Sequence, residues 1–198
     1  PTPGSLAELP EGVRVGTASL RRKAQILQAR PDLDIAPLRG NIGTRLAKLA
    51  PDTVAATVLA MAGLNRIGYT GPDWQALAPN IMLPAAGQGA LAVQCRADDA
   101  TLIAQLAVLD DVGTRACVTA ERSFLAGLDG SCRTPIAALA IPDPENAQTA
   151  LLHGRLLAED GTEFVDNTCR FDPADLDAAG AAGAQLAAEL RTRAPHLV

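Results

Sequence analysis

The stretch VRVGTASLRRKAQILQARPDLDIAPLRGNIGTRL, residues 13–46, decides the fold of this chain. Its first half predicts an apolar strand at residues 13–16 that ends in glycine and leads into a helix that reaches Ala29. Thr17 or Ser19 can cap that helix, because a hydroxyl oxygen accepts a hydrogen bond from a free N–H group of the first helical turn. A strand that leads directly into a capped helix is the repeating unit of an α/β fold.

The same pattern then repeats along the chain. Residues 35–38 form a second strand, Gly40 makes the turn, and Asn41 caps a helix that reaches Leu49. Residues 54–60 form a third strand. Strands that alternate with helices predict a mainly parallel sheet, and ligands of such sheets bind where the strand ends and helix N-termini gather.

Five arginines lie at or directly after these turns. Residues 14–66 hold nine Lys or Arg against three Asp, although the whole chain has a formal net charge of -5. Helix N-termini already favour anions, and guanidinium groups add bidentate donors for carboxylate or phosphate. From the residues alone, a solvated helix face and an anion-binding site both remain open. The five are Arg21, Arg22, Arg39, Arg45 and Arg66.

The composition argues against several classes of protein. The chain has 198 residues, of which 48% are hydrophobic, enough for two small domains or one larger one. No apolar run approaches the roughly 18 residues of a membrane helix, and no signal peptide is visible. The aromatic content of 3%, the net charge of -5 and the isoelectric point near 5.0 argue against a nucleic-acid-binding protein. No Gly-x-Gly-x-x-Gly motif follows the first strand, so a dinucleotide site is not expected.

The four cysteines and two histidines fit no metal-binding spacing. The α/β pattern without a signal peptide favours a reducing cytoplasm, in which these thiols stay free. Cys132 differs from the others because it lies in a polar loop beside Arg133, where a thiol is accessible and its thiolate form is favoured. A loop cysteine without a function is the alternative. The other three, Cys95, Cys117 and Cys169, lie in predicted helices or strands.

The middle of the chain is rich in small residues. Short strands are expected at residues 81–84 and 90–96, and the second buries Cys95. Between them lies a Gly-rich turn, residues 85–90, which allows a ligand or another domain to approach the backbone closely. A simple tight turn between strands is the alternative. Trp74 is expected to pack inward.

The C-terminal part of the chain predicts a small α+β domain. A helix at residues 99–108 precedes a longer one at residues 111–128. Two hairpin turns then separate three strands, which predicts an antiparallel sheet, and a long Ala-rich helix follows. The strands are expected at residues 136–141, 150–157 and 163–171, and the last helix at residues 173–193.

Five motifs resemble those of a known family. They are GTASLRR (residues 16–22), LRGNIGTRL (38–46), AGLNR (62–66), LPAAGQGAL (83–91) and GSCRTPI (130–136). In this order they resemble the motifs of hydroxymethylbilane synthase, also called porphobilinogen deaminase, over nearly the whole chain. Each motif alone is a weak signal, whereas five in register are specific.

This resemblance implies a domain organisation. Residues 1–83 correspond to most of the family's second domain, an α/β domain similar to periplasmic binding proteins with a mainly parallel sheet. Residues 84–110 correspond to the segment that returns to the first domain and to a hinge. Residues 111–198 correspond to the C-terminal α+β domain, which has a three-stranded antiparallel sheet and carries the cofactor cysteine.

The resemblance also implies an activity. Members of the family are transferases of porphyrin and heme biosynthesis that join four porphobilinogen units head to tail and release ammonia each time. The growing pyrrole chain stays attached to a dipyrromethane cofactor, and Cys132 matches the cysteine that holds this cofactor by a thioether bond. Thr17 and Ser19 match hydroxyl positions of the binding site. The arginines that bind the carboxylates of cofactor, substrate and growing chain match Arg21, Arg22, Arg39, Arg45 and Arg66.

One departure from the family limits what the chain is expected to do alone. Most of the first domain is missing, and no carboxylate within the 198 residues matches the family's catalytic aspartate. We therefore expect the C-terminal portion of a longer, monomeric, cytoplasmic enzyme. Alone, it should not catalyse, and it should associate with its first domain or with itself through exposed strand edges. The non-enzymatic alternative is a binding module for a small polycarboxylate, without an adduct on Cys132.

Overall fold

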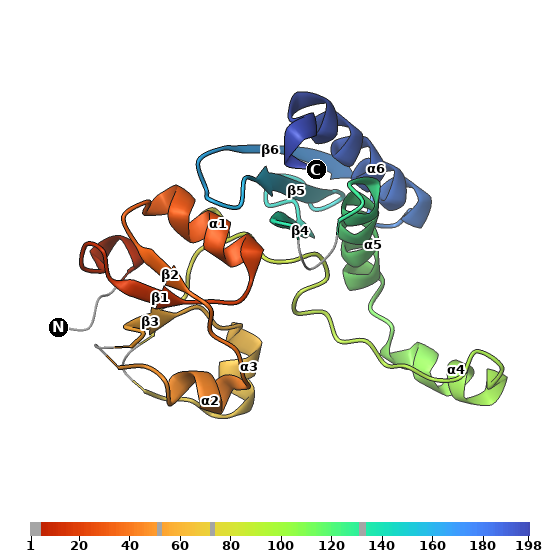
Figure 1. The fold of residues 1–198 in the computed structure, drawn as a ribbon. Coiled ribbons are helices and arrows are strands. Elements are labelled where there is room, and N and C mark those ends of the chain that lie inside the picture. The colour runs from red at the N-terminus through yellow and green to blue at the C-terminus, as the bar shows by residue number, and fades with distance from the viewer. Residues whose placement is uncertain (1–4, 51–52, 72–73, 131–133) are drawn as a thin grey trace.

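The chain folds into two units, each with its own sheet, that are joined by an extended segment (Figure 1). We call residues 5–83 the N-terminal unit, residues 84–110 the connecting segment and residues 111–198 the C-terminal unit. In the figure the connecting segment runs from yellow to green. Its first residues contact both units, Gln88 through Arg21 and Gly87 through Glu121, and only its later part, around residues 100–109, extends away from them. This computed structural model describes residues 5–50, 53–71, 74–130 and 134–198.

The N-terminal unit contains a three-stranded parallel sheet with helices, as the sequence predicts. The strand order is β2-β1-β3, and Val15 of the central strand pairs with Ile35 on one side and Ala56 on the other. All three strands run in the same direction, so their carboxyl ends meet at one edge of the sheet. The elements are η1 (Leu6–Glu8), β1 (Arg14–Gly16), α1 (Leu20–Ala29), β2 (Asp34–Ala36), α2 (Ile42–Leu46), β3 (Ala56–Thr57) and α3 (Met61–Arg66).

Side-chain caps set the starts of the first two helices. Ser19 Oγ accepts a hydrogen bond from Arg22 N at 3.4 Å, and Asn41 Oδ1 accepts one from Thr44 N at 2.8 Å. The predicted caps at Ser19 and Asn41 are therefore confirmed. Thr17 does not cap α1; its Oγ1 accepts a hydrogen bond from Ser19 N at 3.2 Å and so shapes the turn before the helix.

The C-terminal unit has the α+β architecture that the sequence predicts. Its antiparallel sheet has the order β4-β5-β6, and α5 and α6 pack against each other and against the sheet (Figure 1). Phe124, Leu152 and Leu186 are buried in the core between these layers, and this apolar burial stabilises the unit. The elements are α5 (Val112–Gly127), β4 (Ile136–Pro142), β5 (Ala150–Leu157), β6 (Phe164–Phe171), α6 (Leu176–Arg193) and η3 (Pro195–Leu197).

The predictions for the middle of the chain are wrong in several details. Residues 81–84 and 90–96 form no strand, Leu91 is 91% exposed, and Cys95 is only half-buried. A strand needs a neighbour for its backbone hydrogen bonds, and within the described ranges no strand pairs with either stretch. Trp74 is 42% exposed instead of packing inward.

The helices of the connecting segment are short and exposed. They are α4 (Ala100–Leu106), whose N-terminus is capped by Asp99, and η2 (Ala107–Leu109). The helix predicted at residues 99–108 is thus present as an α-helix followed directly by a 3-10 helix. None of the helices in the described part of the chain combines the length and apolar character that crossing a membrane requires.

The two helices of the C-terminal unit touch backbone to backbone at Gly183. A Cβ atom placed on Gly183 would lie 2.8 Å from Phe124 N and would also collide with Ala120 O, both on α5. A Cβ atom on Gly180, one turn earlier in α6, would meet only Thr119 Cγ2 at 3.9 Å. The close approach of α5 and α6 therefore depends on glycine at 183 but not at 180.

Replacing Gly183 by alanine should lower the free energy of unfolding by about 1–3 kcal/mol, because the added methyl group forces the two helices apart. The matched control, Gly180→Ala, should raise it by up to about 1 kcal/mol, because alanine favours the helix and has room at that position. Urea denaturation of both variants measures the difference. A Gly183→Ala variant as stable as Gly180→Ala would contradict the observed helix packing.

Candidate functional site

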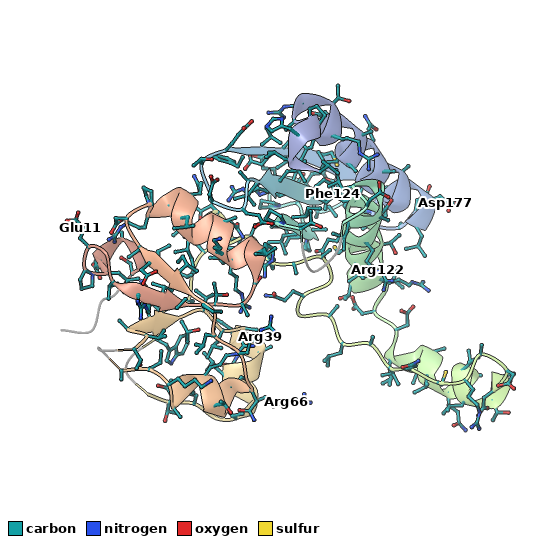
Figure 2. The ribbon with its side chains drawn as sticks, in the orientation of Figure 1. Glu11, Arg39, Arg66, Arg122, Phe124 and Asp177 are labelled. Carbon is teal, nitrogen blue, oxygen red and sulfur yellow. The ribbon has the colours of Figure 1, made fainter. Side chains whose placement is uncertain are left out.

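The five arginines lie at the edge of the N-terminal sheet where the parallel strands end. Arg21 and Arg22 occupy the first turn of α1, directly after β1. Arg39 follows β2, Arg45 lies in α2, and Arg66 is the last residue of α3. Arg39 and Arg66 are exposed, and both lie on the same side of the unit (Figure 2). The connections after β1 and β2 thus carry or precede Arg21, Arg22 and Arg39, whereas Arg45 and Arg66 lie in the short helices that follow β2 and β3.

Arg21 is a nearly buried cation, only 7% exposed. Its Nη1 donates a hydrogen bond to Leu83 O at 2.5 Å, and its Nη2 donates one to Gln88 Oε1 at 3.3 Å. Burial, together with the charge of Arg22, lowers the pKa of Arg21 to about 10. The guanidinium is still charged at neutral pH, so it remains a desolvated cation with two neutral acceptors. A bound carboxylate would compensate for that desolvation.

Arg22 and Arg45 extend the positive charge from α1 to α2. Arg22 Nη1 donates a hydrogen bond to Val58 O at 2.8 Å, and Arg45 Nε donates one to Gly40 O at 2.8 Å. Burial lowers the pKa of Arg22, and the charge of Arg45 lowers it further. Each guanidinium has five N–H donors. Most donors of these two residues therefore have no acceptor among the described residues and are available to a ligand.

None of the five arginines forms an ion pair within the described ranges of the chain. Arginines elsewhere in the N-terminal unit are paired: Arg14 contacts Asp34 at 2.7 Å, and Arg30 contacts Asp32 at 2.6 Å. Arg14 stands at the start of β1, at the opposite end of the strand from Arg21. Positive charge is therefore balanced at one end of the strand and unbalanced at the other, which suits a polyanionic ligand.

The two predicted hydroxyl residues organise the turn that presents Arg21 and Arg22. Thr17 is 7% exposed, and its backbone N–H donates a hydrogen bond to Ala36 O at 2.9 Å, which ties the end of β1 to β2. Ser19 is half-buried and caps α1 through Arg22 N. Their direct role in binding a ligand stays a prediction.

The predicted cofactor cysteine, Cys132, lies outside the described residues, as does Arg133. Two of the described cysteines, Cys117 and Cys169, are half-buried. Burial raises the pKa of both thiols, and nearby carboxylates raise it further, so these two thiols are poorly activated. In the described parts of the chain, no group of three or more His, Cys, Asp or Glu side chains is arranged to hold a metal ion.

Two residues that hold Arg21 in place, Gln25 and Gln88, are not among the site residues predicted from the sequence. Gln25 lies one turn after Arg21 on α1 and is fully buried. Its Oε1 accepts a hydrogen bond from Leu83 N at 2.8 Å, and its Nε2 donates one to Leu83 O at 3.0 Å. Gln88, the second acceptor of Arg21, lies in the Gly-rich turn at residues 85–90. The sequence does contain a signal for Gln25: it is a polar residue four positions after Arg21, on the helix face that is buried.

An open α/β sheet with unpaired arginines at its carboxyl edge, joined to a separate α+β unit, is an arrangement that suits anionic ligands. Comparison with known proteins gives the family. A family profile described as "Porphobilinogen deaminase, dipyromethane cofactor binding domain" matches residues 2–104, and one described as "Porphobilinogen deaminase, C-terminal domain" matches residues 115–192. The chain belongs to the porphobilinogen deaminase family, as the five motifs predict.

Several proteins named porphobilinogen deaminase are similar to most of the chain. The protein of Nitrobacter winogradskyi is 46% identical over 194 residues, which cover 98% of the chain and 60% of that protein. The protein of Paracoccus denitrificans is 48% identical over 96% of the chain and 59% of its own length. The protein of Brevibacillus brevis is 50% identical over 83% of the chain and 52% of its own length. The chain therefore spans between half and two thirds of these relatives.

Removing one unpaired arginine should weaken anion binding. We expect Arg22→Gln to raise the dissociation constant for porphobilinogen, a dicarboxylate, by about tenfold, because it removes a charge-assisted hydrogen bond. Isothermal titration calorimetry at constant ionic strength measures the effect. The matched control is Arg14→Gln, which removes the same charge from the other end of the sheet. Equal losses in both variants would show that only the net charge matters and would contradict a localised site.

Proposed function

We propose that this chain supplies the arginine-rich binding site and the cofactor-bearing cysteine of a porphobilinogen deaminase, that is, a hydroxymethylbilane synthase. The assembled enzyme is a transferase of porphyrin and heme biosynthesis that joins four porphobilinogen units and releases ammonia at each addition. The observation that carries this proposal is the set of five arginines at one sheet edge, none of them ion-paired among the described residues.

The chemistry of the donors fits the proposed ligand. Each porphobilinogen unit carries an acetate and a propionate, so a dipyrromethane brings four carboxylates and each added unit brings two more. Guanidinium groups bind carboxylates through two parallel N–H···O bonds and keep their charge. In this proposal Arg21 and Arg22 hold the carboxylates nearest to α1. The other three arginines, with Thr17 and Ser19, complete the binding surface.

Cys132 has a different role in the proposal. Its sulfur forms the thioether that holds the dipyrromethane, and the growing pyrrole chain stays attached while units are added. The thiol is an anchor that is used once, when the cofactor is installed, and it is not a nucleophile in each turnover. The family profile that matches residues 2–104, described as a dipyromethane cofactor binding domain, supports a cofactor of this kind.

The arginines bind and orient, but they do not transfer protons at neutral pH. Loss of ammonia and joining of the units require proton transfer, for which a carboxylate of suitable pKa is the ordinary group. No Asp or Glu of the described residues is paired with the five arginines. We therefore propose that the catalytic carboxylate comes from another segment and that these 198 residues alone do not catalyse.

The connecting segment is the proposed contact for that further segment. Leu91 is 91% exposed, Val93 is 63% exposed and Val108 is 84% exposed, so this stretch presents apolar side chains to solvent. Exposed apolar side chains beside unpaired backbone groups favour association with another chain. In this proposal residues 84–110 join the first domain of the family fold, and without it the chain self-associates.

Mass spectrometry tests the proposal that the cofactor is attached to Cys132. We expect enzyme purified from cells that make porphobilinogen to carry an adduct of two pyrrole units, found by denaturing intact mass measurement and by peptide mapping. The adduct should lie on the peptide that contains Cys132 and be absent from the peptides of Cys95, Cys117 and Cys169. An active enzyme with a bare thiol at Cys132 would overturn the anchoring role.

The activity proposal is tested by ammonia release. The chain alone should release no ammonia from porphobilinogen, and release should appear when the first domain of the family is supplied as a separate polypeptide. The variant Cys132→Ser should bind that polypeptide but fail to produce hydroxymethylbilane. Porphobilinogen binding without ammonia release, even in the assembled protein, would instead support a non-catalytic binding module.

A further inference from the structure

Arg155 of β5 connects the two units of the chain. Its side chain is 8% exposed. On the side of the C-terminal unit, Nε and Nη2 donate hydrogen bonds to Asp166 Oδ2 at 3.1 and 2.8 Å. On the other side, Nη1 reaches Gln25 Oε1 at 3.4 Å and Asn80 O at 3.5 Å, both in the N-terminal unit. One guanidinium therefore bonds to β6 and to the N-terminal unit at the same time.

The hydrogen bonds continue from Gln25 to the arginine site. Gln25 holds the backbone of Leu83 on both sides, through Leu83 N at 2.8 Å and Leu83 O at 3.0 Å. The same carbonyl oxygen accepts the hydrogen bond from Arg21 Nη1. Arg21, Gln25, Leu83 and Arg155 are buried, whereas Asp166 is partly buried and Asn80 is exposed. A continuous series of contacts thus runs from Asp166 through Arg155, Gln25 and Leu83 to Arg21.

Asp166 and Arg155, at the end of this series that lies in the C-terminal unit, have further contacts. Asp166 also contacts His153 Nε2 at 3.1 Å, and Arg155 Cζ lies 5.3 Å from the centre of the Phe164 ring. Burial raises the pKa of Asp166, but the hydrogen bonds and charges of Arg155 and His153 outweigh it and hold that pKa below its ordinary value. Asp166 is therefore ionised at neutral pH and fixes the guanidinium in one orientation.

A second contact brings the same two parts together. Gly161 lies in the turn between β5 and β6 with φ +73°, and it sits directly on the backbone of α1. A Cβ atom on Gly161 would lie 2.5 Å from Gln28 N and 2.6 Å from Ala24 O. The turn therefore touches α1 on both sides of Gln25, at Ala24 and at Gln28. The Arg155 contact belongs to a close interface and is not an isolated bond.

We propose that Arg155 is a positioning residue: through Gln25 and Leu83 it fixes Arg21 of the anion site relative to the C-terminal unit. The value of this role for catalysis rests on the function proposed above, in which Arg21 binds pyrrole carboxylates and the C-terminal unit carries the cofactor. Removing Arg155 leaves Gln25 Oε1 with one partner and removes one of the contacts that fix the two units to each other. Leu83 then becomes a less constrained acceptor for Arg21.

Hydrogen exchange at a single amide tests the proposal. In the full chain, Arg155→Met should speed exchange of the Leu83 amide by about tenfold, because a charge-assisted contact that holds its acceptor Gln25 is lost. The matched control is Arg170→Met. Arg170 is another arginine of the C-terminal sheet, paired with Asp143 at 2.6 Å and Glu145 at 2.8 Å, and none of its described contacts reaches the N-terminal unit.

The Arg170→Met control distinguishes a positioning role of Arg155 from a general loss of stability. Arg170→Met should destabilise the C-terminal unit in urea denaturation yet leave exchange of the Leu83 amide unchanged. Exchange at Leu83 that is unchanged in Arg155→Met, or equally raised in Arg170→Met, would overturn the proposal. If methionine at 155 unfolds the chain, Arg155→Lys gives the same comparison, because lysine keeps a charge opposite Asp166 but has no second arm for Gln25.

Binding of porphobilinogen is measured on the same proteins. Arg155→Met should weaken it by about tenfold although Arg155 is not one of the five arginines of the proposed site, and Arg170→Met should not. A wild-type chain that binds no porphobilinogen would contradict the proposed function, whereas the exchange experiment would still decide whether Arg155 positions α1. Normal binding by Arg155→Met in the presence of fast Leu83 exchange would reject the link between Arg155 and the anion site.

Discussion

The backbone of Leu83 is the point on which the described architecture depends. Its carbonyl oxygen accepts hydrogen bonds from Arg21 and Gln25, and its N–H group donates one to Gln25. A buried peptide group must have partners, and here both partners come from one turn of α1. Residues about sixty positions apart in the chain are therefore fixed to each other. The start of the connecting segment, the first helix and the anion site behave as one piece of structure.

Two arginines are nearly buried in the described parts of the chain, and they are stabilised in different ways. Arg155 is neutralised by Asp166, so its burial is balanced within the fold. Arg21 has only neutral acceptors among the described residues, and Arg22 stands beside it. A buried charge without a counter-ion costs several kcal/mol. The hydrogen bonds of Arg21 to Leu83 and Gln88 compensate for part of this cost, and a bound carboxylate would compensate for more of it.

Local sequence signals predicted the N-terminal unit well and the connecting segment poorly. Ser19 and Asn41 were identified as caps because a cap acts on an N–H group three residues ahead, within reach of a sequence pattern. Residues 90–96 have the composition of a strand but form none, because pairing depends on a neighbouring strand that composition does not report. Trp74, which the sequence predicts to pack inward, is exposed.

The sequence by itself determined the order of strands and helices, the helix caps, the five arginines at the strand ends and the family, because these features act over a few residues or survive as motifs. The tertiary structure alone decided which groups hold the site. Gln25 and Arg155 are 130 positions apart and meet only when α1 packs against β5. No local pattern encodes that contact, because the two side chains come together through the relative placement of two separately folded sheets.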